Sequence, residues 1–416
     1  MSSYQKDRQY YHFCAYGFLK NLRFFDAFLL LFFLENGLYY TQIGLLYSAR
    51  EIAINVLEIP SGLFADAWGR KYSLVLAFAL YIFAFGFFYL ATNFYHLLAA
   101  VLLMGIGDAF RSGTHKGMIM DYLRAKGWSQ DKVSYYGATR AWSQKGSAIS
   151  ALMAGLLVLY SGEYRSIYLL SIIPYLGNFI NILAYPQFLN KPYQKGPTKQ
   201  LPSLKRVFQS FVKAIRQRGV RPIINSAALH SAYLKSIKDY IQSVMVAISL
   251  TLPILTDHPD KEKSGLVIGI LYFVIFILNS QASRYAYLLA KDPKLKTAHI
   301  TLLLGLGMGV ISGWMIYFEL WWLACLFFVF IFVIENLRKP VLTAMLAEKV
   351  PEQVLTSVLS SQSFYKTFLV SSLSLSFGII ADASNIGFAL VIISVSLLVF
   401  HSLAIGARFT RKEPQI

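Results

Sequence analysis

"SGLFADAWGRK" (Ser61–Lys71) lies between two strongly apolar stretches of the 416-residue chain. The segment combines two glycines, an isolated aspartate and a closing Gly-Arg-Lys. Glycine lets a chain turn within a few residues, and arginine and lysine beside a bilayer favour its cytoplasmic side. A polar turn of this kind predicts the cytoplasmic end of one membrane-spanning segment and the start of the next.

Apolar runs long enough to cross a bilayer recur along the whole chain. The sequence is 56% hydrophobic and 14% charged, with a mean hydropathy of +0.50, whereas an average soluble domain has about 25% charged residues. Because each crossing must satisfy its own backbone hydrogen bonds, the runs predict helices and an all-α polytopic membrane protein. At about 20 residues per crossing, twelve spans are expected, at about 12–35, 42–65, 72–92, 96–123, 134–160, 165–186, 222–250, 264–290, 297–317, 319–347, 354–381 and 384–407.

The net charge of +18 is concentrated in one segment. Residues 191–221 contain nine Lys and Arg and no acidic residue. Nucleic-acid binding is one explanation, but the positive-inside rule explains the segment as a cytoplasmic loop, which we prefer, and its charges also suit anionic lipid headgroups. Because the loops after even-numbered spans are richer in Lys and Arg, both termini are expected in the cytoplasm.

The basic segment separates two sets of six spans that resemble each other. "FLKNLR" (18–23) matches "YLKSIK" (233–238), "DAFR" (108–111) matches "ENLR" (335–338), and Lys145 matches Lys366. The three offsets are similar, which favours two duplicated, pseudo-symmetric six-helix bundles, as in many secondary transporters. The expected domains are therefore 1–190 and 222–416, with the cytoplasmic linker 191–221 between them.

The opening segment carries a family resemblance. "GLFADAWGRK" resembles the loop 2–3 signature of the major facilitator superfamily, usually Gly-x-Leu-Ala-Asp-Arg-x-Gly-Arg-Lys, and departs from it at Phe64 and Ala67. "EIPSG" (58–62) and "MIMDYL" (118–123) resemble a large bacterial subgroup. The resemblance implies a twelve-helix fold, alternating access between two bundles, and a location in the bacterial inner (plasma) membrane.

Two departures separate the chain from typical drug/proton antiporters of that superfamily. These antiporters usually carry an arginine on the fourth span, where this chain has Val101, and a Gly-rich pattern on the fifth span, where this chain reads "GATRAWSQKGSAISALMAGLL". Efflux of drugs or other amphiphilic toxic compounds is therefore the alternative function rather than the first choice.

Ionisable residues inside spans are costly to insert, at about 2.5–3.5 kcal/mol each, so each is a candidate for function. The candidates for the substrate or ion pathway are Asp26, Arg50, Glu51, Asp108, Arg111, His115, Arg140, Lys145, Glu335, Arg338 and Lys366. The candidates for a conformational latch are Glu58, Gly62, Asp66, Gly69, Arg70 and Lys71. Basic candidates for the pathway outnumber acidic ones, which favours an anionic or zwitterionic solute.

Each candidate also has a structural interpretation. Asp26 is a candidate proton carrier, or it pairs locally with Arg23 three residues earlier. Arg50 and Glu51 diverge by about 100° on a helix, so one is expected to line the pathway while the other pairs with a neighbouring helix. In the opening segment, Asp66 is expected to pair with an arginine or a helix N-terminus.

The fourth and tenth spans, which the resemblance places along the central path, carry similar charged patterns. Asp108, Arg111 and His115 fall at i, i+3 and i+7, which puts them on one helix face. Glu335 and Arg338 repeat the carboxylate–arginine spacing. Such a pair predicts a protonation switch that frees the arginine for an anionic substrate, and two structural salt bridges at a gate are the alternative.

The predicted function is secondary active transport of a small solute, with protons as the coupling ion, by a monomer that contacts membrane lipid. An enzyme is not expected, because the sequence has no HExxH, no P-loop and no phosphate-binding glycine loop. A channel would not explain the two similar halves. Neither a cofactor nor a metal is expected, since Cys14 and Cys325 have no ligand spacing, and no nucleic-acid partner is expected.

Overall fold

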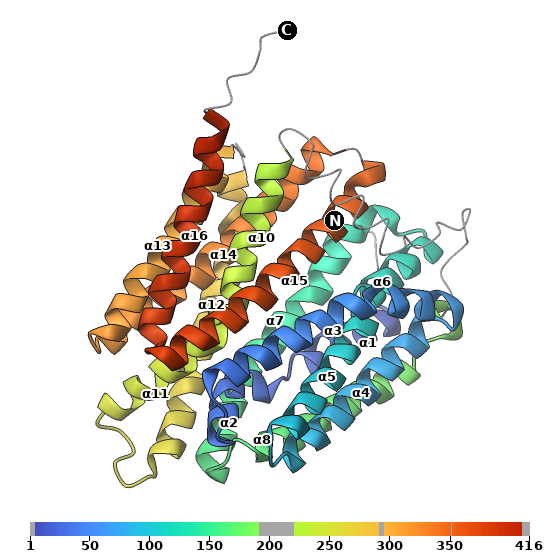
Figure 1. The fold of residues 1–416 in the computed structure, drawn as a ribbon. Helices are drawn as coiled ribbons and strands as arrows, with labels where there is room; N and C mark the ends of the chain where they lie inside the picture. The colour runs from blue at the N-terminus through green and yellow to red at the C-terminus, as the bar shows by residue number, and fades with distance from the viewer. Residues whose placement is uncertain (1–4, 191–219, 291–294, 351, 410–416) are drawn as a thin grey trace. The chain divides into compact units, whose positions relative to one another are not determined.

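The computed structural model describes residues 5–190, 220–290, 295–350 and 352–409, and every regular element in that part of the chain is a helix (Figure 1). Residues 191–219, which hold nearly all of the expected linker, lie outside the described residues. The described chain is all-α, as the apolar runs predicted.

The helices before residue 190 are α1 (Arg8–Lys20), the 3-10 turn η1 (Phe24–Ala27), α2 (Leu29–Glu35), α3 (Tyr40–Ala67), α4 (Arg70–Leu90), α5 (Phe94–Arg111), α6 (Thr114–Ala125), η2 (Ser129–Asp131), α7 (Lys132–Ser161), α8 (Ser166–Leu183) and η3 (Gln187–Leu189). Those after residue 220 are α10 (Arg221–Ile237), η4 (Lys238–Tyr240), α11 (Ile241–Thr251), α12 (Asp260–Ala290), α13 (Leu295–Tyr317), α14 (Trp321–Lys349), α15 (Glu352–Ala383) and α16 (Ile386–Phe409). Eight helices of the described chain are long and apolar enough to cross a membrane. With α1 joined to α2, α5 to α6 and α10 to α11, the described helices form the twelve expected crossings.

Three crossings are interrupted, where the sequence predicted continuous spans. The first and the seventh break within the matched segments "FLKNLR" and "YLKSIK", each beside a 3-10 turn. In the first crossing, the side-chain amide of Asn21 donates a hydrogen bond of 2.8 Å to Gly17 O. This bond competes for an acceptor that a backbone N–H of the continuing helix would use. The fourth crossing breaks at Ser112–Gly113, where Gly113 has φ +70° and starts a new helix direction.

The described helices belong to two compact units. Unit 1 comprises residues 1–38, 46–209 and 249–277, and unit 2 comprises residues 39–45, 210–248 and 278–416. In unit 1, α4 packs on α5 and α8, and α1 packs on α7 and α8. In unit 2, α13 packs on α14 and α16 and α10 packs on α15 (Figure 1). The domain boundaries expected at 190 and 222 stay a prediction.

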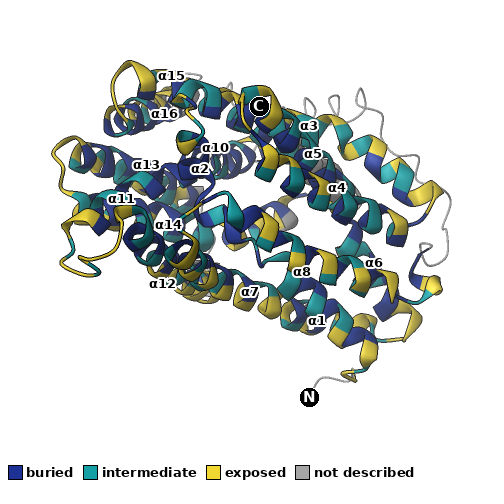
Figure 2. Ribbon diagram, turned by 90° about the horizontal axis from the view of Figure 1, so that it is seen from below, coloured by how far each residue is buried: buried dark blue, intermediate teal, exposed yellow. Residues whose placement is uncertain are grey.

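Exposed and buried residues lie on different faces of the helices (Figure 2). Many of the exposed residues are large and apolar, among them Phe83, Leu156 and Leu403. Apolar side chains on an outward face are expected where a helix meets lipid. Cys14 and Cys325 are both buried and free.

Glycines set how closely the helices of unit 1 approach. A Cβ at Gly146 of α7 would lie 2.5 Å from Phe18 O of α1, and a Cβ at Gly155 would lie 2.8 Å from Gly265 O of α12. Small residues at these positions therefore allow backbone-to-backbone contact between helices. The α1–α7 contact matters for function because these two helices carry much of the cavity described below.

We predict that Gly146→Ala lowers the thermal unfolding midpoint of the purified protein in detergent, because the added methyl group overpacks the α1–α7 contact, at a cost of about 1–3 kcal/mol. Gly137→Ala on the same helix is the matched control: no heavy atom lies within 4 Å of its added Cβ. The control is expected to gain about 0.5–1 kcal/mol from helix propensity. A midpoint for Gly146→Ala equal to that of the control would contradict the close packing.

Candidate functional site

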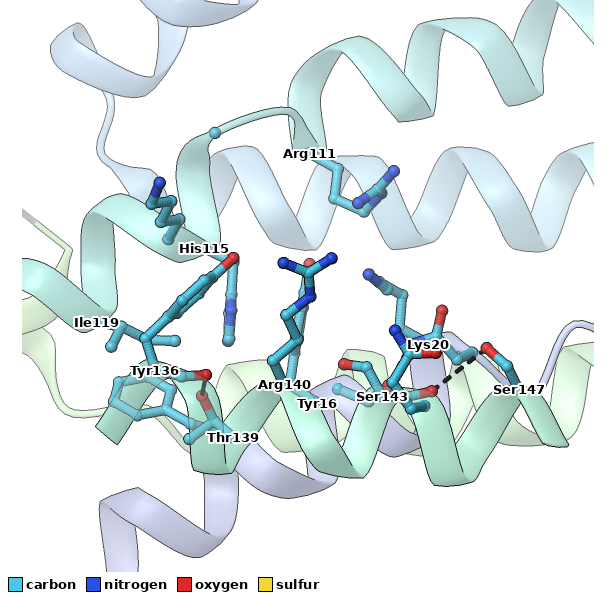
Figure 3. Close-up of a pocket in the computed structure, with 16 residues that line it drawn as sticks. Tyr16, Lys20, Arg111, His115, Ile119, Tyr136, Thr139, Arg140, Ser143 and Ser147 are labelled. Carbon is cyan, nitrogen blue, oxygen red and sulfur yellow. Dashed lines mark hydrogen bonds between the residues drawn. The ribbon is translucent and has the colours of Figure 1, made fainter. Parts of the chain in front are cut away.

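A cavity of about 460 Å³ lies within unit 1, between α1, α7 and the broken α5–α6 crossing (Figure 3). Its size suits a small organic molecule. Figure 3 shows the side chains of Lys20, Arg111 and Arg140 directed into the same space from three helices.

Four basic side chains line the cavity: Lys20, Arg111, Lys116 and Arg140. None of the lining residues, all within the described chain, is an aspartate or a glutamate. Lys116 also lies over the ring of Tyr136, with its Nζ 5.5 Å from the ring centroid. A concave surface that carries charge of a single sign concentrates the field and attracts ions of opposite charge.

The uncharged part of the wall is rich in hydrogen-bonding groups. On α7, Thr139, Ser143 and Ser147 fall at i, i+4 and i+8 and so share one helix face. Gly17 of α1 leaves room for that face, since a Cβ there would lie 2.6 Å from Ser143 Oγ. The cavity therefore combines cations with hydroxyl groups.

Asp108 is the carboxylate next to this wall, and three arginines surround it. Its Oδ2 lies 2.6 Å from Arg50 Nη2, and its Oδ1 lies 2.9 Å from Arg111 Nη2 and 3.7 Å from Arg23 Nη2. Tyr81 donates a hydrogen bond of 2.7 Å to the same Oδ1. Only 7% of Asp108 is exposed. One buried carboxylate thus contacts three guanidinium groups, of which Arg23 also pairs with Asp26.

Arg111 connects this cluster to the cavity. Its Nη2 pairs with Asp108 and its Nε donates to the Tyr81 hydroxyl at 2.8 Å, while its side chain also lines the cavity. Of the two adjacent residues of α3, Arg50 pairs with Asp108 and Glu51 is buried. The predicted local pair between Arg23 and Asp26 is present at 3.7 Å.

The expected face formed by Asp108, Arg111 and His115 is wrong in one respect. The helix breaks at Ser112–Gly113, so His115 belongs to α6 and does not continue the spacing of α5. His115 nevertheless lines the same cavity, where its ring stacks on Tyr16 with centroids 3.5 Å apart. Its Nε2 lies 3.2 Å from the Tyr185 hydroxyl.

Besides Arg50 and Arg338, two further predicted basic residues lie outside the cavity wall. Lys145 is exposed on α7, with its Nζ 4.7 Å from the centroid of the Trp142 ring. Lys366 is half-buried on α15 and belongs to unit 2. Of the basic candidates on the fifth span, the structure therefore brings Arg140 to the cavity and leaves Lys145 out.

The predicted Glu335–Arg338 pair does not form in the described structure. Arg338 instead donates to Ala298 O at 2.8 Å and to Ser226 O at 3.0 Å, and so joins α13 and α10 to α14. Glu335 lies 2.8 Å from His230 Nδ1 and accepts a hydrogen bond from Ser231. A buried guanidinium takes carbonyl acceptors where they are within reach, because unpaired donors are costly there.

The opening segment, which the sequence predicts to be a latch, contacts partners that the sequence did not indicate. Gly69 has φ +110° and connects α3 to α4. Arg70 pairs with Asp121 of α6, and Lys71 Nζ donates to Tyr185 O at 2.8 Å. Asp66 is exposed and makes no ion pair in the described part of the chain, so its expected partner is not found. Gly62 and the exposed Glu58 lie one turn apart on α3.

Three residues of these clusters were missed as candidates. Lys20 lies in "FLKNLR", a segment used only as evidence of duplication, although a lysine in an apolar run is itself a signal. Tyr81 gives no signal among so many aromatic residues. His230 is a single histidine whose partner is 105 residues away.

Comparison with known proteins identifies related sequences. The sequence profile described as Major Facilitator Superfamily matches residues 18–375. The uncharacterized MFS-type transporter YxaM of Bacillus subtilis (strain 168) is 21% identical over 376 residues, which cover 90% of this chain and 89% of the relative. The hexuronate transporter of the same organism is 26% identical over 165 residues, which cover 40% of this chain and 37% of the relative.

Solved structures share the fold. The nucleoside transporter NupG has a TM-score of 0.70 at 15% identity, with 98% of this chain and 100% of that chain covered. A POT family transporter in complex with a thioalcohol-conjugated peptide has a TM-score of 0.71 at 12% identity, with 97% of each chain covered. At these identities the likeness establishes the fold alone.

We predict that Asp121→Asn lowers the thermal unfolding midpoint, because it leaves Arg70 at the latch without its counter-charge. Removing one partner of a buried pair costs up to about 3–5 kcal/mol. Asp66→Asn is the matched control, expected within about 0.5 kcal/mol of wild type because Asp66 is exposed. Equal midpoints for the two variants would show that the Arg70–Asp121 pair does not hold the latch.

Proposed function

Because the chain belongs to the Major Facilitator Superfamily, and is a membrane transporter rather than an enzyme, we propose that its solute is a small organic anion. The observation that carries this proposal is the lining of the unit 1 cavity, with four basic side chains and no carboxylate in the described wall. Asp108 does not cancel this charge, since three arginines already share it.

The chemistry of the wall narrows the class of anion. Arg111 and Arg140 offer guanidinium groups that suit carboxylate or phosphate oxygens. Thr139, Ser143 and Ser147 offer hydroxyls to the remainder of the solute. A hydroxylated organic acid of about the size of a monosaccharide fits both parts of the wall, and the partial similarity to a hexuronate transporter supports the same class.

The remaining features of the proposal follow from the sequence and the family. The Lys and Arg bias of the loops supports cytoplasmic termini and an inner-membrane location. We also propose that a monomer works by alternating access, with the solute moved by a proton gradient. Efflux of cationic amphiphiles is disfavoured because the cavity wall would repel them.

We predict that Arg140→Gln weakens uptake of the anion in proteoliposomes. Loss of one charge-assisted hydrogen bond, about 1.5–3 kcal/mol, corresponds to a rise in KM of roughly ten- to a hundredfold. Radiolabelled glucuronate, dicarboxylates and sugar phosphates are tested as solutes under an imposed pH gradient, with a cationic dye tested in parallel.

Lys145→Gln is the matched control, because Lys145 lies on the same helix outside the cavity wall. It removes the same charge and is expected to keep the wild-type KM. Uptake of the dye but of none of the acids by the wild-type protein would refute anion transport. Equal KM values for the two variants would remove the cavity from solute binding.

A further inference from the structure

A second polar cluster lies within unit 2, where α10 meets α14. Its members are His230 and Ser231 on α10 and Glu335 on α14, and none of them lines the cationic cavity. His230 Nδ1 lies 2.8 Å from Glu335 Oε2, and the Ser231 hydroxyl donates to Oε1. His230 is fully buried. A buried histidine held on a carboxylate in this way has not been assigned a role above.

The contacts require a proton between His230 and Glu335. His230 Nδ1 and Glu335 Oε2 lie 2.8 Å apart. Without a proton between them, the two atoms would face each other with lone pairs only, which is repulsive, so one of them must carry a proton. Since Glu335 also accepts from Ser231, the arrangement fits an ionised Glu335 with a neutral His230 that carries its proton on Nδ1. The second ring nitrogen, Nε2, then keeps a free lone pair.

Nε2 is buried and has no hydrogen-bond partner among the described residues. It faces α13 at Gly305, where an added Cβ would collide with it. Gly305 thus provides the space into which the imidazole edge fits. An unpaired polar atom is unfavourable in such a place, so its persistence calls for an explanation.

We propose that the His230–Glu335 pair is the binding site of the coupling proton, with Nε2 as the atom that takes it. This inference rests on the proton-coupled transport proposed above. A proton from water forms an N–H bond with the Nε2 lone pair, and no bond of the protein breaks. The pair changes from a net charge of −1 to 0, because the imidazolium is balanced by the Glu335 carboxylate.

Protonation is tied to a change of structure. Nε2–H would have no acceptor in the described arrangement, so this conformation favours the proton-free pair. A conformation that brings water or another acceptor to Nε2 favours the proton-loaded pair. A proton that binds the two conformations with different affinity shifts the population between them, as coupling requires.

The surroundings of His230 leave Glu335 as its charge partner. Arg338, one turn after Glu335, is hydrogen-bonded to Ser226 and Ala298, so its charge is fixed on other groups. Other titratable groups on α10 and on the packed helices α13 and α15 are Arg221, Tyr233, Lys235, Lys296, His299, Tyr317, Glu352, Tyr365, Lys366 and Asp382.

Asp108 is a weaker candidate for the same role. Its carboxylate already has three guanidinium neighbours and a tyrosine donor. Neutralising it would leave several buried cations without their counter-charge, which is costly. The Glu335–His230 pair becomes neutral when it gains a proton. Asp108 would instead lose the negative charge that stabilises its neighbouring arginines.

The test uses His230→Asn in the full-length chain. The asparagine amide can still donate to Glu335 as Nδ1–H does, but the variant has no Nε2. His299→Asn is the control, because His299 is also in unit 2 and lies 3.1 Å from the ring of His401. Proton binding by the purified protein is measured with a pH-indicator dye and without any solute.

Wild type is expected to bind one proton more per chain than His230→Asn, and His299→Asn, which also removes one imidazole, is expected to keep uptake driven by a pH gradient. In proteoliposomes, His230→Asn is expected to lose uptake driven by a pH gradient and to keep exchange of radiolabelled glucuronate across the membrane, since exchange needs no net proton movement. Glu335→Gln is expected to lose gradient-driven uptake as well, which keeps the test decisive if the asparagine variant misfolds.

The possible results distinguish the proton-binding site at His230 from the proposed transport of an anion. Equal proton binding by wild type and His230→Asn would overturn the site, and so would loss of gradient-driven uptake in His299→Asn but not in His230→Asn. A wild-type protein that moves glucuronate without regard to the pH gradient would overturn proton coupling and this site together. A wild-type protein that moves no anion would refute the proposed function, while the dye measurement still decides whether His230 binds the proton.

Discussion

The buried contact between Asp108 and its arginines sets the electrostatics of unit 1. One carboxylate lies within ion-pair distance of Arg50, Arg111 and Arg23 and so links α3, α5 and the break after α1. Charges at such depth are expensive and persist only with partners. The contact therefore holds the helices together and keeps the Asp108 carboxylate on its arginines, and the described wall of the neighbouring cavity carries basic side chains and no carboxylate.

The cavity depends on that contact and on two breaks in the helices. The break at Ser112–Gly113 turns α6 away from α5, so that Arg111 and His115 reach one space from different helices. The break after α1 leaves Lys20 as the last residue of a helix that packs on α7 through Gly17 and Gly146. Arg140 projects from α7 into the same space (Figure 3). Charge and shape together suit an anion with hydroxyl groups.

Much of the fold could be predicted from the sequence, because long apolar runs leave helices as the main solution in a membrane and the signature around Asp66 is specific. The individual side-chain contacts could not be predicted in this way. Asp66 has no ion-pair partner in the described chain whereas Arg70 pairs with Asp121, and Arg338 donates to backbone carbonyl groups rather than pairing with Glu335. The partner of each charged side chain depends on which acceptor the folded chain brings within about 3 Å of it. That distance cannot be derived from the sequence alone. The sequence predicted Arg111, His115 and Arg140 as pathway residues, but not that they share one cavity with Lys20, because these residues converge only after the helices break.

Charge selectivity is the property that follows most directly from the positive cavity. Glucuronate, glucose and glucosamine have nearly the same size and differ mainly in charge, so they separate charge from shape. Uptake of the three in proteoliposomes of the wild-type protein, at one pH and one salt concentration, is the decisive measurement. We expect glucuronate to be preferred over glucose, and glucosamine to be excluded. Entry of glucosamine or glucose at the rate of glucuronate would contradict the role assigned to the cavity.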